Sequence, residues 1–392
     1  GTIEDRAGNT ATLTLAAAGV AGSLSVNKAL VIDGAIPTFS ARAATAGTKT
    51  VTLTVSEAVT GSPATGDFTV TTNNVNNPVT AVAVDGTAVT LTITNYIENS
   101  ATVTVGYTKS STAENQLKDA GGNALATLGS AATVTVSNDG TGPTVSGVSS
   151  TSDDGSYSIG DLIPVTVTFS EAVVVDTSGG TPTLTLETGT TDRTATYVSG
   201  SDSTVLVFNY TVQSGDTSGD LAYTGTNALT LNSGTIEDRA GNTATLTLAA
   251  AGVAGSLSVN KALVIDGVAP TFRTSSGSTS PVNGGTLTGS EGTLPNIVLD
   301  FSEAIQAIEG VTLTDNISIT TPLGADDKIV NFTAEIVGGN LIINLDETDA
   351  DISSAVNQQL FIDIAANTLS DASSNSVVEI VGVNSYSILI SI

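Results

Sequence analysis

The chain contains no cysteine, histidine, methionine or tryptophan among its 392 residues. The absence of cysteine excludes disulfide bonds and thiolate metal sites. The absence of histidine excludes Ser-His-Asp triads, and it removes the commonest zinc ligand and the usual base of neutral-pH catalysis. Carboxylates, amides and hydroxyls are therefore the side chains left to carry any chemistry.

Positive charge is scarce, because 11 basic residues face 38 acidic ones and the net charge is −27. Nucleic acid and anionic membrane surfaces both need a basic face, so we expect neither as a partner. The sequence also has no apolar run of the length that a transmembrane helix needs, and we expect no direct membrane insertion. A strongly acidic chain favours cations as ligands.

Aromatic residues make up only 4% of the chain, and helical periodicity is absent. What is present is strict alternation of apolar residues with threonine, as in residues 51–55, 89–94 and 101–105. This period of two predicts half-buried antiparallel strands, and many short strands predict β-sandwiches. The residues expected to point into the cores are Val51, Leu53, Val55, Val165, Val167, Phe169, Ile297, Leu299 and Phe301.

One segment of 34 residues occurs twice without change, as residues 1–34 and 234–267. Identity over that length indicates modules in tandem. Three linkers of the form Asp-Gly-x-x-Pro-Thr begin at Asp33, Asp139 and Asp266. They divide the chain into a tail, residues 1–34, which is the end of an incomplete module, and three full modules at 35–140, 141–267 and 268–392. Because the linkers are short, we expect neighbouring modules to touch and form a rod.

Each full module repeats two further signatures. Ser-Glu-Ala ends an early strand at residues 56–58, 170–172 and 302–304. Asp-x-Ala-Gly-Asn, or a variant of it, precedes the last strands at residues 119–123, 238–242 and 371–375, and the tail keeps it at residues 5–9.

These linkers and signatures resemble those of the bacterial immunoglobulin-like repeats of large extracellular surface adhesins, including type I-secreted adhesins and cyanobacterial surface proteins. The resemblance is strong over residues 35–267 and weaker over 268–392, where Asp-Ala-Ser-Ser-Asn has lost the glycine. It implies an all-β fold of tandem immunoglobulin-like sandwiches. It also implies an extracellular stalk or adhesive array that calcium often stiffens.

The topology of such a sandwich brings both signatures to the pole where the linker enters. Three carboxylates crowded together repel one another, and a hard cation that takes six to eight oxygens relieves the repulsion. We therefore predict a calcium (Ca²⁺) site at each junction, although aspartate and asparagine also close turns without any metal. The predicted ligands are Asp33, Glu57, Asp119 and Asn123; Asp139, Glu171, Asp238 and Asn242; and Asp266, Glu303, Asp371 and Asn375.

Two other acidic clusters are Asp153 with Asp154 and Asp216 with Asp220. We expect both in solvated loops, although the second cluster could reach the junction at Asp266. Carboxylate pairs also occur in glycosidases. A catalytic site, however, would not usually recur once in every module.

The sequence thus predicts a non-enzymatic extracellular protein of the bacterial cell surface, a calcium-stiffened adhesin stalk. Its partners would be neighbouring modules of the same or an identical chain, and a cell-surface or glycan receptor. The alternatives are a subunit of a surface layer, sheath or filament, and a carbohydrate-binding module. We expect the tail to be completed by upstream strands of its own chain, with completion by a second copy as the alternative.

Overall fold

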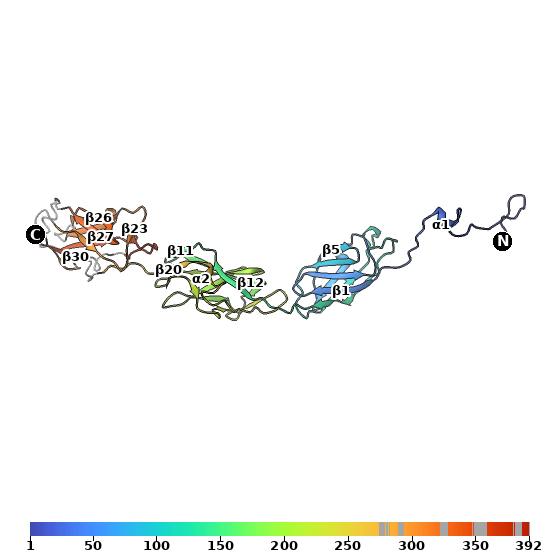
Figure 1. The fold of residues 1–392 in the computed structure, drawn as a ribbon, viewed down its shortest axis with the longest axis horizontal. Helices are drawn as coiled ribbons and strands as arrows, with labels where there is room; N and C mark the ends of the chain where they lie inside the picture. The colour runs from blue at the N-terminus through green and yellow to red at the C-terminus, as the bar shows by residue number, and fades with distance from the viewer. Residues whose placement is uncertain are drawn as a thin grey trace. The chain divides into compact units, whose positions relative to one another are not determined.

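The computed structural model describes residues 1–273, 279, 281, 283–288, 294–321, 328–346, 348, 359–378, 380 and 386–391 (Figure 1). Within these residues the fold is all-β, in tandem sandwiches of the immunoglobulin-like kind. The helices α1 (Leu24–Asn27), α2 (Leu257–Asn260) and α3 (Leu313–Asn316) are single turns. None of the helices in the described part of the chain has the length and apolar character that a membrane span requires.

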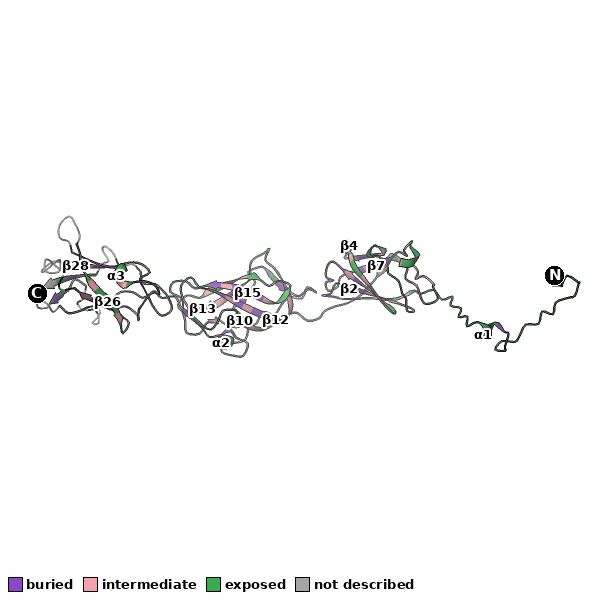
Figure 2. Ribbon diagram, turned by 90° about the horizontal axis from the view of Figure 1, so that it is seen from above, coloured by how far each residue is buried: buried purple, intermediate pink, exposed green. Residues whose placement is uncertain are grey.

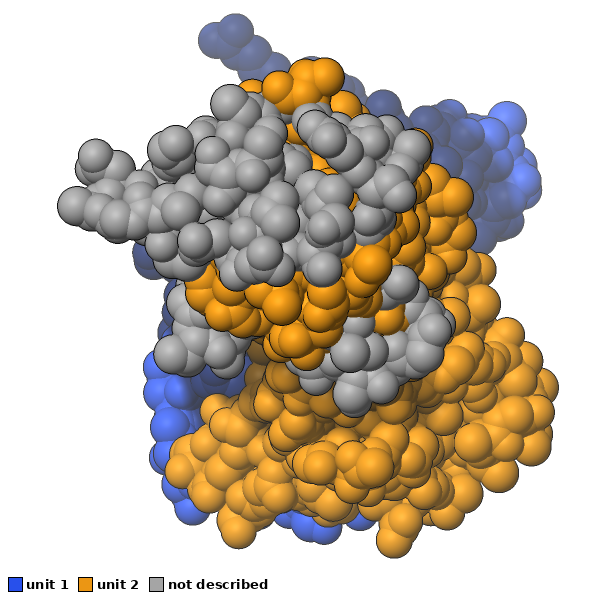
Figure 3. Space-filling model, turned by 90° about the vertical axis from the view of Figure 1, so that its left-hand side faces the viewer, with its two compact units in different colours: residues 1–141, 239–242 blue, residues 142–238, 243–392 orange. Residues whose placement is uncertain are grey.

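The chain divides into two compact units (Figure 3). Unit 1 is Gly1–Thr141 together with Arg239–Asn242, and unit 2 is Gly142–Asp238 together with Thr243–Ile392. Among the residues that the structure describes, unit 1 holds one hydrophobic core and unit 2 holds two. The module boundaries expected after residues 34, 140 and 267 remain predictions.

The core of unit 1 lies between two layers of mostly antiparallel strands, in which β1-β2, β3-β4 and β5-β6 are hairpins. One layer has the strand order β5-β6-β2-β1-β9, in which only β9 joins its neighbour in parallel, and the other has the order β4-β3-β7-β8. The strands are β1 (Phe39–Thr45), β2 (Thr50–Val55), β3 (Phe68–Thr72), β4 (Val75–Asn76), β5 (Val79–Asp85), β6 (Ala88–Ile93), β7 (Val103–Tyr107), β8 (Leu128–Thr133) and β9 (Thr135–Ser137). Two 3-10 turns, η1 (Thr65–Asp67) and η2 (Ala113–Asn115), lie in the connections.

The first core of unit 2 is built on a larger sheet of order β10-β12-β15-β14-β13-β17, with a small sheet β11-β20-β16 beside it. In addition, β18 pairs with β13, and β19 pairs with β12. The strands are β10 (Val145–Ser150), β11 (Gly155–Tyr157), β12 (Leu162–Asp176), β13 (Thr183–Glu187), β14 (Arg193–Ser199), β15 (Ser203–Thr211), β16 (Thr217–Ser218), β17 (Ala222–Tyr223), β18 (Leu229–Thr230), β19 (Thr235–Glu237) and β20 (Leu263–Asp266).

The second core of unit 2 lies among three sheets of the described residues, of orders β21-β30-β28-β24-β25, β22-β27-β26 and β23-β29. The strands are β21 (Thr286–Thr288), β22 (Ile297–Leu299), β23 (Gln306–Ala307), β24 (Ile317–Thr321), β25 (Lys328–Ile329), β26 (Phe332–Val337), β27 (Asn340–Leu345), β28 (Gln359–Ile364), β29 (Leu369–Ser370) and β30 (Tyr386–Ser391).

The alternation in the sequence predicts the buried faces correctly. In β2 the residues Val51, Leu53 and Val55 are at most 2% exposed, whereas Thr52 and Thr54 between them are half-buried. The early strands of the other two cores follow the same rule. The apolar face of each strand is therefore what holds the sheets together, since burial of apolar surface is the dominant favourable term in folding.

The repeated segment adopts two different states. In residues 234–267 the side chains of Leu257, Leu263 and Ile265 are 0–2% exposed within the first core of unit 2. In residues 1–34 the equivalent Leu24, Leu30 and Ile32 are 68%, 64% and 93% exposed, and Figure 2 shows this tail almost wholly exposed. The sequence is identical, so the difference comes from the strands that surround the segment.

Asp216 is not in a solvated loop, and that expectation is wrong. Its side chain is 1% exposed and accepts hydrogen bonds from Tyr210 Oη at 2.7 Å and from the backbone N–H of Gln213 at 2.9 Å. Arg193 Nε forms an ion pair with its other oxygen at 2.7 Å. Burial, followed by the hydrogen bond to Asp216, raises the pKa of Tyr210, which therefore stays protonated as the donor. The backbone of Asp216 also bonds that of Gly267, so the network anchors the linker that follows.

We predict that Asp216→Ala lowers the free energy of unfolding of unit 2 by about 3 kcal/mol, because it leaves Arg193 and Tyr210 without their buried acceptor. Chemical denaturation of the full chain measures this loss. Asp220→Ala is the matched control, since Asp220 is exposed. Equal effects of the two substitutions would contradict the role given to Asp216.

Candidate functional site

A reciprocal pair of hydrogen bonds attaches Ser-Glu-Ala to the entry linker. In unit 1 the N–H of Thr38 donates to Ser56 Oγ at 3.0 Å, and the N–H of Ser56 donates to the carbonyl of Thr38 at 2.8 Å. The glutamate that follows the serine is thereby held beside the linker.

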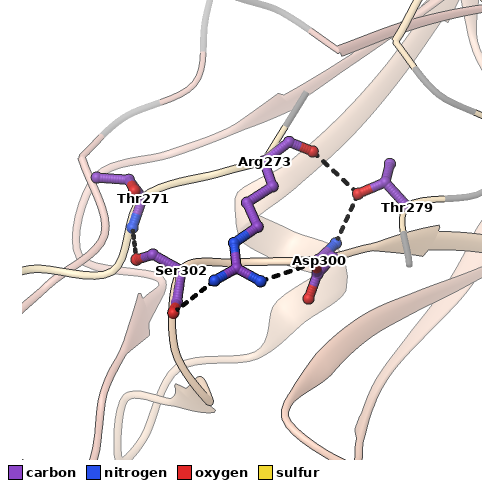
Figure 4. Close-up of polar contacts among 5 residues, drawn as sticks. All are labelled: Thr271, Arg273, Thr279, Asp300 and Ser302. Carbon is purple, nitrogen blue, oxygen red and sulfur yellow. Dashed lines mark hydrogen bonds and ion pairs between the residues drawn. The ribbon is translucent and has the colours of Figure 1, made fainter. Parts of the chain in front are cut away.

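The same pair recurs at both other linkers. Thr144 and Ser170 bond each other at 3.0 and 2.8 Å, and Thr271 and Ser302 at 2.9 and 2.8 Å. Figure 4 shows the last pair beside Arg273, which bonds the carbonyl of Ser302 at 3.0 Å. We call this reciprocal pair of hydrogen bonds, between the linker threonine and the serine of Ser-Glu-Ala, the Ser-Thr clamp. The sequence analysis did not predict it, although the recurrence of Pro-Thr and of Ser-Glu-Ala at the same pole could have indicated it.

The Asp-x-Ala-Gly-Asn signature forms a second recurring structure, which we call the aspartate loop: residues 119–123 in unit 1 and residues 371–375 in unit 2. Asp119 Oδ1 accepts the backbone N–H of Asn123 at 2.9 Å, and Asp119 Oδ2 accepts the Asn123 side-chain amide at 3.0 Å. In the third module Asp371 and Asn375 repeat both bonds, at 2.9 and 3.0 Å. The loop therefore closes on itself, with its aspartate buried in both modules.

The asparagine of this loop also bonds the linker. Asn123 Nδ2 donates to the carbonyl of Asp33 at 3.1 Å, and Asn375 Nδ2 donates to the carbonyl of Asp266 at 2.7 Å. Gly121 lies so close to the linker that a Cβ on it would stand 2.9 Å from that of Asp33. The predicted asparagine ligands thus fix the linker main chain to the loop.

Three carboxylates come together as a result. In unit 1, oxygens of Asp33, Glu57 and Asp119 lie within 4.8 Å of one another. In unit 2, oxygens of Asp266, Glu303 and Asp371 do the same. In each set the loop aspartate is buried and the glutamate is half-buried.

The four ligands predicted at the second linker, Asp139, Glu171, Asp238 and Asn242, belong to different units. Asp139 and Asn242 are part of unit 1, where Asn242 Nδ2 donates to the carbonyl of Asp139 at 3.3 Å. Glu171 and Asp238 are part of unit 2, where Glu171 lies inside β12 and not after its end.

The electrostatics of the two sets are those of crowded like charges. Burial, together with the charges of Asp119 and Asp33, raises the pKa of Glu57. Burial, together with Asp371 and Asp266, raises the pKa of Glu303 in the same way. Burial also acts to raise the pKa of Asp119, but the hydrogen bonds from Asn123 outweigh it and the pKa falls below its usual value. In each set, therefore, burial and the two neighbouring aspartates oppose ionisation of the glutamate.

Comparison with known proteins finds one repeat family, described as "Putative flagellar system-associated repeat", which matches residues 60–112. Curated proteins give no match. Among solved structures, the chain is similar to the S-layer protein rSbsC(31-844), with 11% identity, a TM-score of 0.22, and coverage of 91% of this chain and 54% of that one. The chain thus spans about half the length of that protein.

Two further solved structures are similar at the same loose level. Domains 4–9 of the surface layer protein SbsC show 15% identity and a TM-score of 0.15, over 87% of this chain and 42% of that one. A chimeric titin Z1Z2 tandem shows 14% identity and a TM-score of 0.15, over 59% of this chain and 99% of that one. At these TM-scores the likeness says nothing about function.

Glu57→Gln should stabilise the calcium-free chain at pH 7, because it removes a charge that its neighbours oppose. A raised pKa in the folded state means that unfolding releases protons, so the wild-type chain gains stability as the pH falls through the pKa of Glu57. The advantage of the variant should therefore disappear below that pH. Thermal unfolding in chelator between pH 4 and 7 measures this effect. The exposed Glu98→Gln is the control, and a pH-independent advantage of Glu57→Gln would contradict the prediction.

Ser374 stands where the other loops have glycine, and its φ is +75°, against +90° at Gly122 and +89° at Gly241. A side chain pays a conformational cost in this left-handed region. Ser374→Gly should therefore raise the free energy of unfolding by about 0.5 kcal/mol, net of the extra chain entropy of glycine. Ser373→Gly is the matched control and should lower stability, since Ser373 is outside that region. Calorimetry of the full chain compares the two, and a loss of stability in both would refute the prediction.

Proposed function

We propose that the chain is a non-enzymatic extracellular structural protein, a calcium-stiffened stalk of tandem immunoglobulin-like modules on a bacterial surface. The observation that carries this proposal is the repetition of one carboxylate set at two linkers, in unit 1 and in unit 2. Each set joins a linker aspartate to two loops of the module that follows it. A repeated set at a repeated linker favours a role in joining modules.

Calcium fits this set of donors by chemistry and by size. Calcium accepts carboxylate, amide and carbonyl oxygens at about 2.3–2.6 Å, so two of its ligands stand at most about 5 Å apart. The oxygens within each set lie inside 4.8 Å of one another. Zinc is disfavoured because the chain has no histidine or cysteine. Asp33, Glu57 and Asp119 would hold one ion, and Asp266, Glu303 and Asp371 another.

The bound ion would act on the linker. The structure already ties the linker main chain to the aspartate loop through Asn123 or Asn375, and to the glutamate through the Ser-Thr clamp. Calcium would add the linker aspartate side chain to both loops and would neutralise their repulsion. The angle between the linker and the module that follows would then be restricted.

The rest of the chain supports a structural role on the cell surface. The strong negative charge keeps an exposed array soluble. The carboxylates recur at the linkers, as expected for a joint and not for a single catalytic centre. A surface location is also in keeping with the description of the repeat family that residues 60–112 match.

Each bound calcium ion should stabilise the module that holds it by about 2.7 kcal/mol when the calcium concentration is a hundred times the dissociation constant. A constant of about 10⁻⁴–10⁻³ M is typical of extracellular modules, so the titration should extend to about 10 mM or above. Calorimetric titration and thermal unfolding, each with and without chelator, measure the binding and the gain.

The double variant Glu57→Gln/Glu303→Gln tests separately the repulsion among the carboxylates and the binding of calcium by them. In chelator it should be more stable than the wild type, and in calcium it should lose most of the gain, so the order of stability reverses. Glu98→Gln/Glu309→Gln is the matched control, because both glutamates are exposed. If calcium stabilises neither the wild type nor the control, the calcium site is refuted.

A further inference from the structure

A polar hollow of about 620 Å³ lies beside the second core of unit 2. Its walls come from β23 and the residues after it, from β29, and from the end of the aspartate loop. A hollow of this size can hold a small organic molecule. The polar residues that line it are Gln306, Glu309, Asn367, Ser370, Ser374 and Ser376.

Strand register places three of these side chains on one face. Gln306 in β23 is the register partner of Ser370 in β29, and Ser370 forms a bridge with Ser376. Directly opposed residues of antiparallel strands point to the same side of a sheet. Leu369 belongs to the hydrophobic core, so the next residue, Ser370, faces away from that core and into the hollow.

The hydroxyl of Ser370 is buried without a partner. Ser370 is 3% exposed, yet its side chain makes no hydrogen bond to any residue that the structure describes. Gln306 Nε2 donates to the main-chain carbonyl of Asp371 at 2.9 Å, which fixes the amide beside this hydroxyl. Burial of a polar group costs free energy unless the group is hydrogen-bonded, so the hollow suits a ligand that bonds Ser370.

The other two cores have longer side chains at the position of Ser370. The equivalents of Gln306, Ser370 and Ser376 are Thr60, Lys118 and Ala124 in unit 1, and Val174, Glu237 and Thr243 in the first core of unit 2. Lys118 and Glu237 are half-buried, and each is long enough to lie across this face of the strands. Serine is too short to do so, and its presence leaves the face open.

Ser374 lines the hollow at a conformational cost. Its φ of +75° lies in the left-handed region, where the equivalent residues are Gly122 and Gly241. Residues held in sparsely populated conformations cluster at ligand sites, where function offsets the strain. Ser374 thus adds a hydroxyl to the hollow while it lowers the stability of the loop.

The chemistry of the lining favours a neutral sugar. Serine hydroxyls and amides offer both donors and acceptors, as the hydroxyl groups of a sugar require. Ala307 and Ile308 add a small apolar surface for its C–H groups. None of the described residues that line the hollow carries a positive charge, and Glu309 adds a negative one. Phosphorylated and acidic sugars are therefore disfavoured.

We propose that this hollow is a subsite for one neutral hexose unit, whose hydroxyl groups bond Gln306, Ser370 and Ser374. The site goes beyond the structural role proposed above, because it gives the chain a ligand of its own. No aromatic ring among the described lining residues stacks on the sugar, so we expect a dissociation constant on the order of 1 mM. Many copies of the chain on one surface would raise the avidity.

Ligand-observed NMR of the full chain tests the proposal with three probes, the methyl glycosides of glucose, mannose and galactose. At least one of them should bind, and N-acetylneuraminic acid, an acidic sugar, should not. The titration is run in chelator, so its outcome is independent of the calcium site. A neutral polysaccharide of the sugar that binds then separates two sources. Tighter binding per sugar unit identifies a surface glycan as the ligand, and no binding identifies a free sugar.

Two variants relate the binding to the hollow. Ser370→Lys introduces the residue that unit 1 carries at this position and should weaken binding about tenfold, as expected when a hydrogen bond to a buried group is lost. Ser374→Gly should weaken binding about threefold, the effect of one ordinary hydrogen bond, while it raises the melting temperature. A loss of affinity in this variant cannot therefore come from unfolding.

Thr333→Lys is the matched control, since Thr333 is an exposed residue of β26 outside the hollow, and it should bind as the wild type does. The proposal is overturned if none of the three glycosides binds at concentrations well above the expected constant. It is equally overturned if Ser370→Lys and Ser374→Gly both bind the sugar as tightly as the wild type.

Discussion

Closure of each sandwich by its last segment is the constraint on which the rest of the structure depends. Residues 234–267 supply β19 and β20, and their leucines complete a core that 142–233 cannot fill without them. The same 34 residues at the start of the chain keep their turns but bury almost nothing. Local sequence therefore determines the turns, whereas long-range pairing determines whether strands form, as expected when packing outweighs intrinsic propensity.

Closure also creates the junction. The last segment of the sandwich, residues 234–267, contains an aspartate loop near its start and the next linker at its end. It therefore supplies a buried carboxylate, Asp238, to one pole and a linker carboxylate, Asp266, to the following pole. The Ser-Thr clamp adds a glutamate to the first pole. The crowding of charge that raises the pKa of Glu57 and Glu303 is thus a product of topology, and it recurs because the topology recurs.

Period-two patterning made the fold class and the buried faces of β2 predictable. The repeated signatures, placed on the topology of a sandwich, made the convergence of Asp33, Glu57 and Asp119 predictable. Three features were not, and each depends on partners that are distant in sequence. Asp216 is buried because strand pairing brings Arg193 to it. β12 continues through Glu171 because β19 pairs with its far half. The clamp joins hydroxyl and main-chain groups, which leave little signal in a single sequence. Whether calcium binds stays a prediction.

The bonds at the linkers have one further property, which concerns the evolution of the array. Asn123 and Asn375 donate to main-chain carbonyls, and Asn375 Oδ1 accepts the main-chain N–H of Ile159 in the module before it. Main-chain partners are the same whatever side chain they carry. A gene encoding such modules can therefore gain, lose or reorder them by recombination without compensating mutations at the joints. The perfect identity of two 34-residue segments is what a recent duplication in such a gene would leave behind.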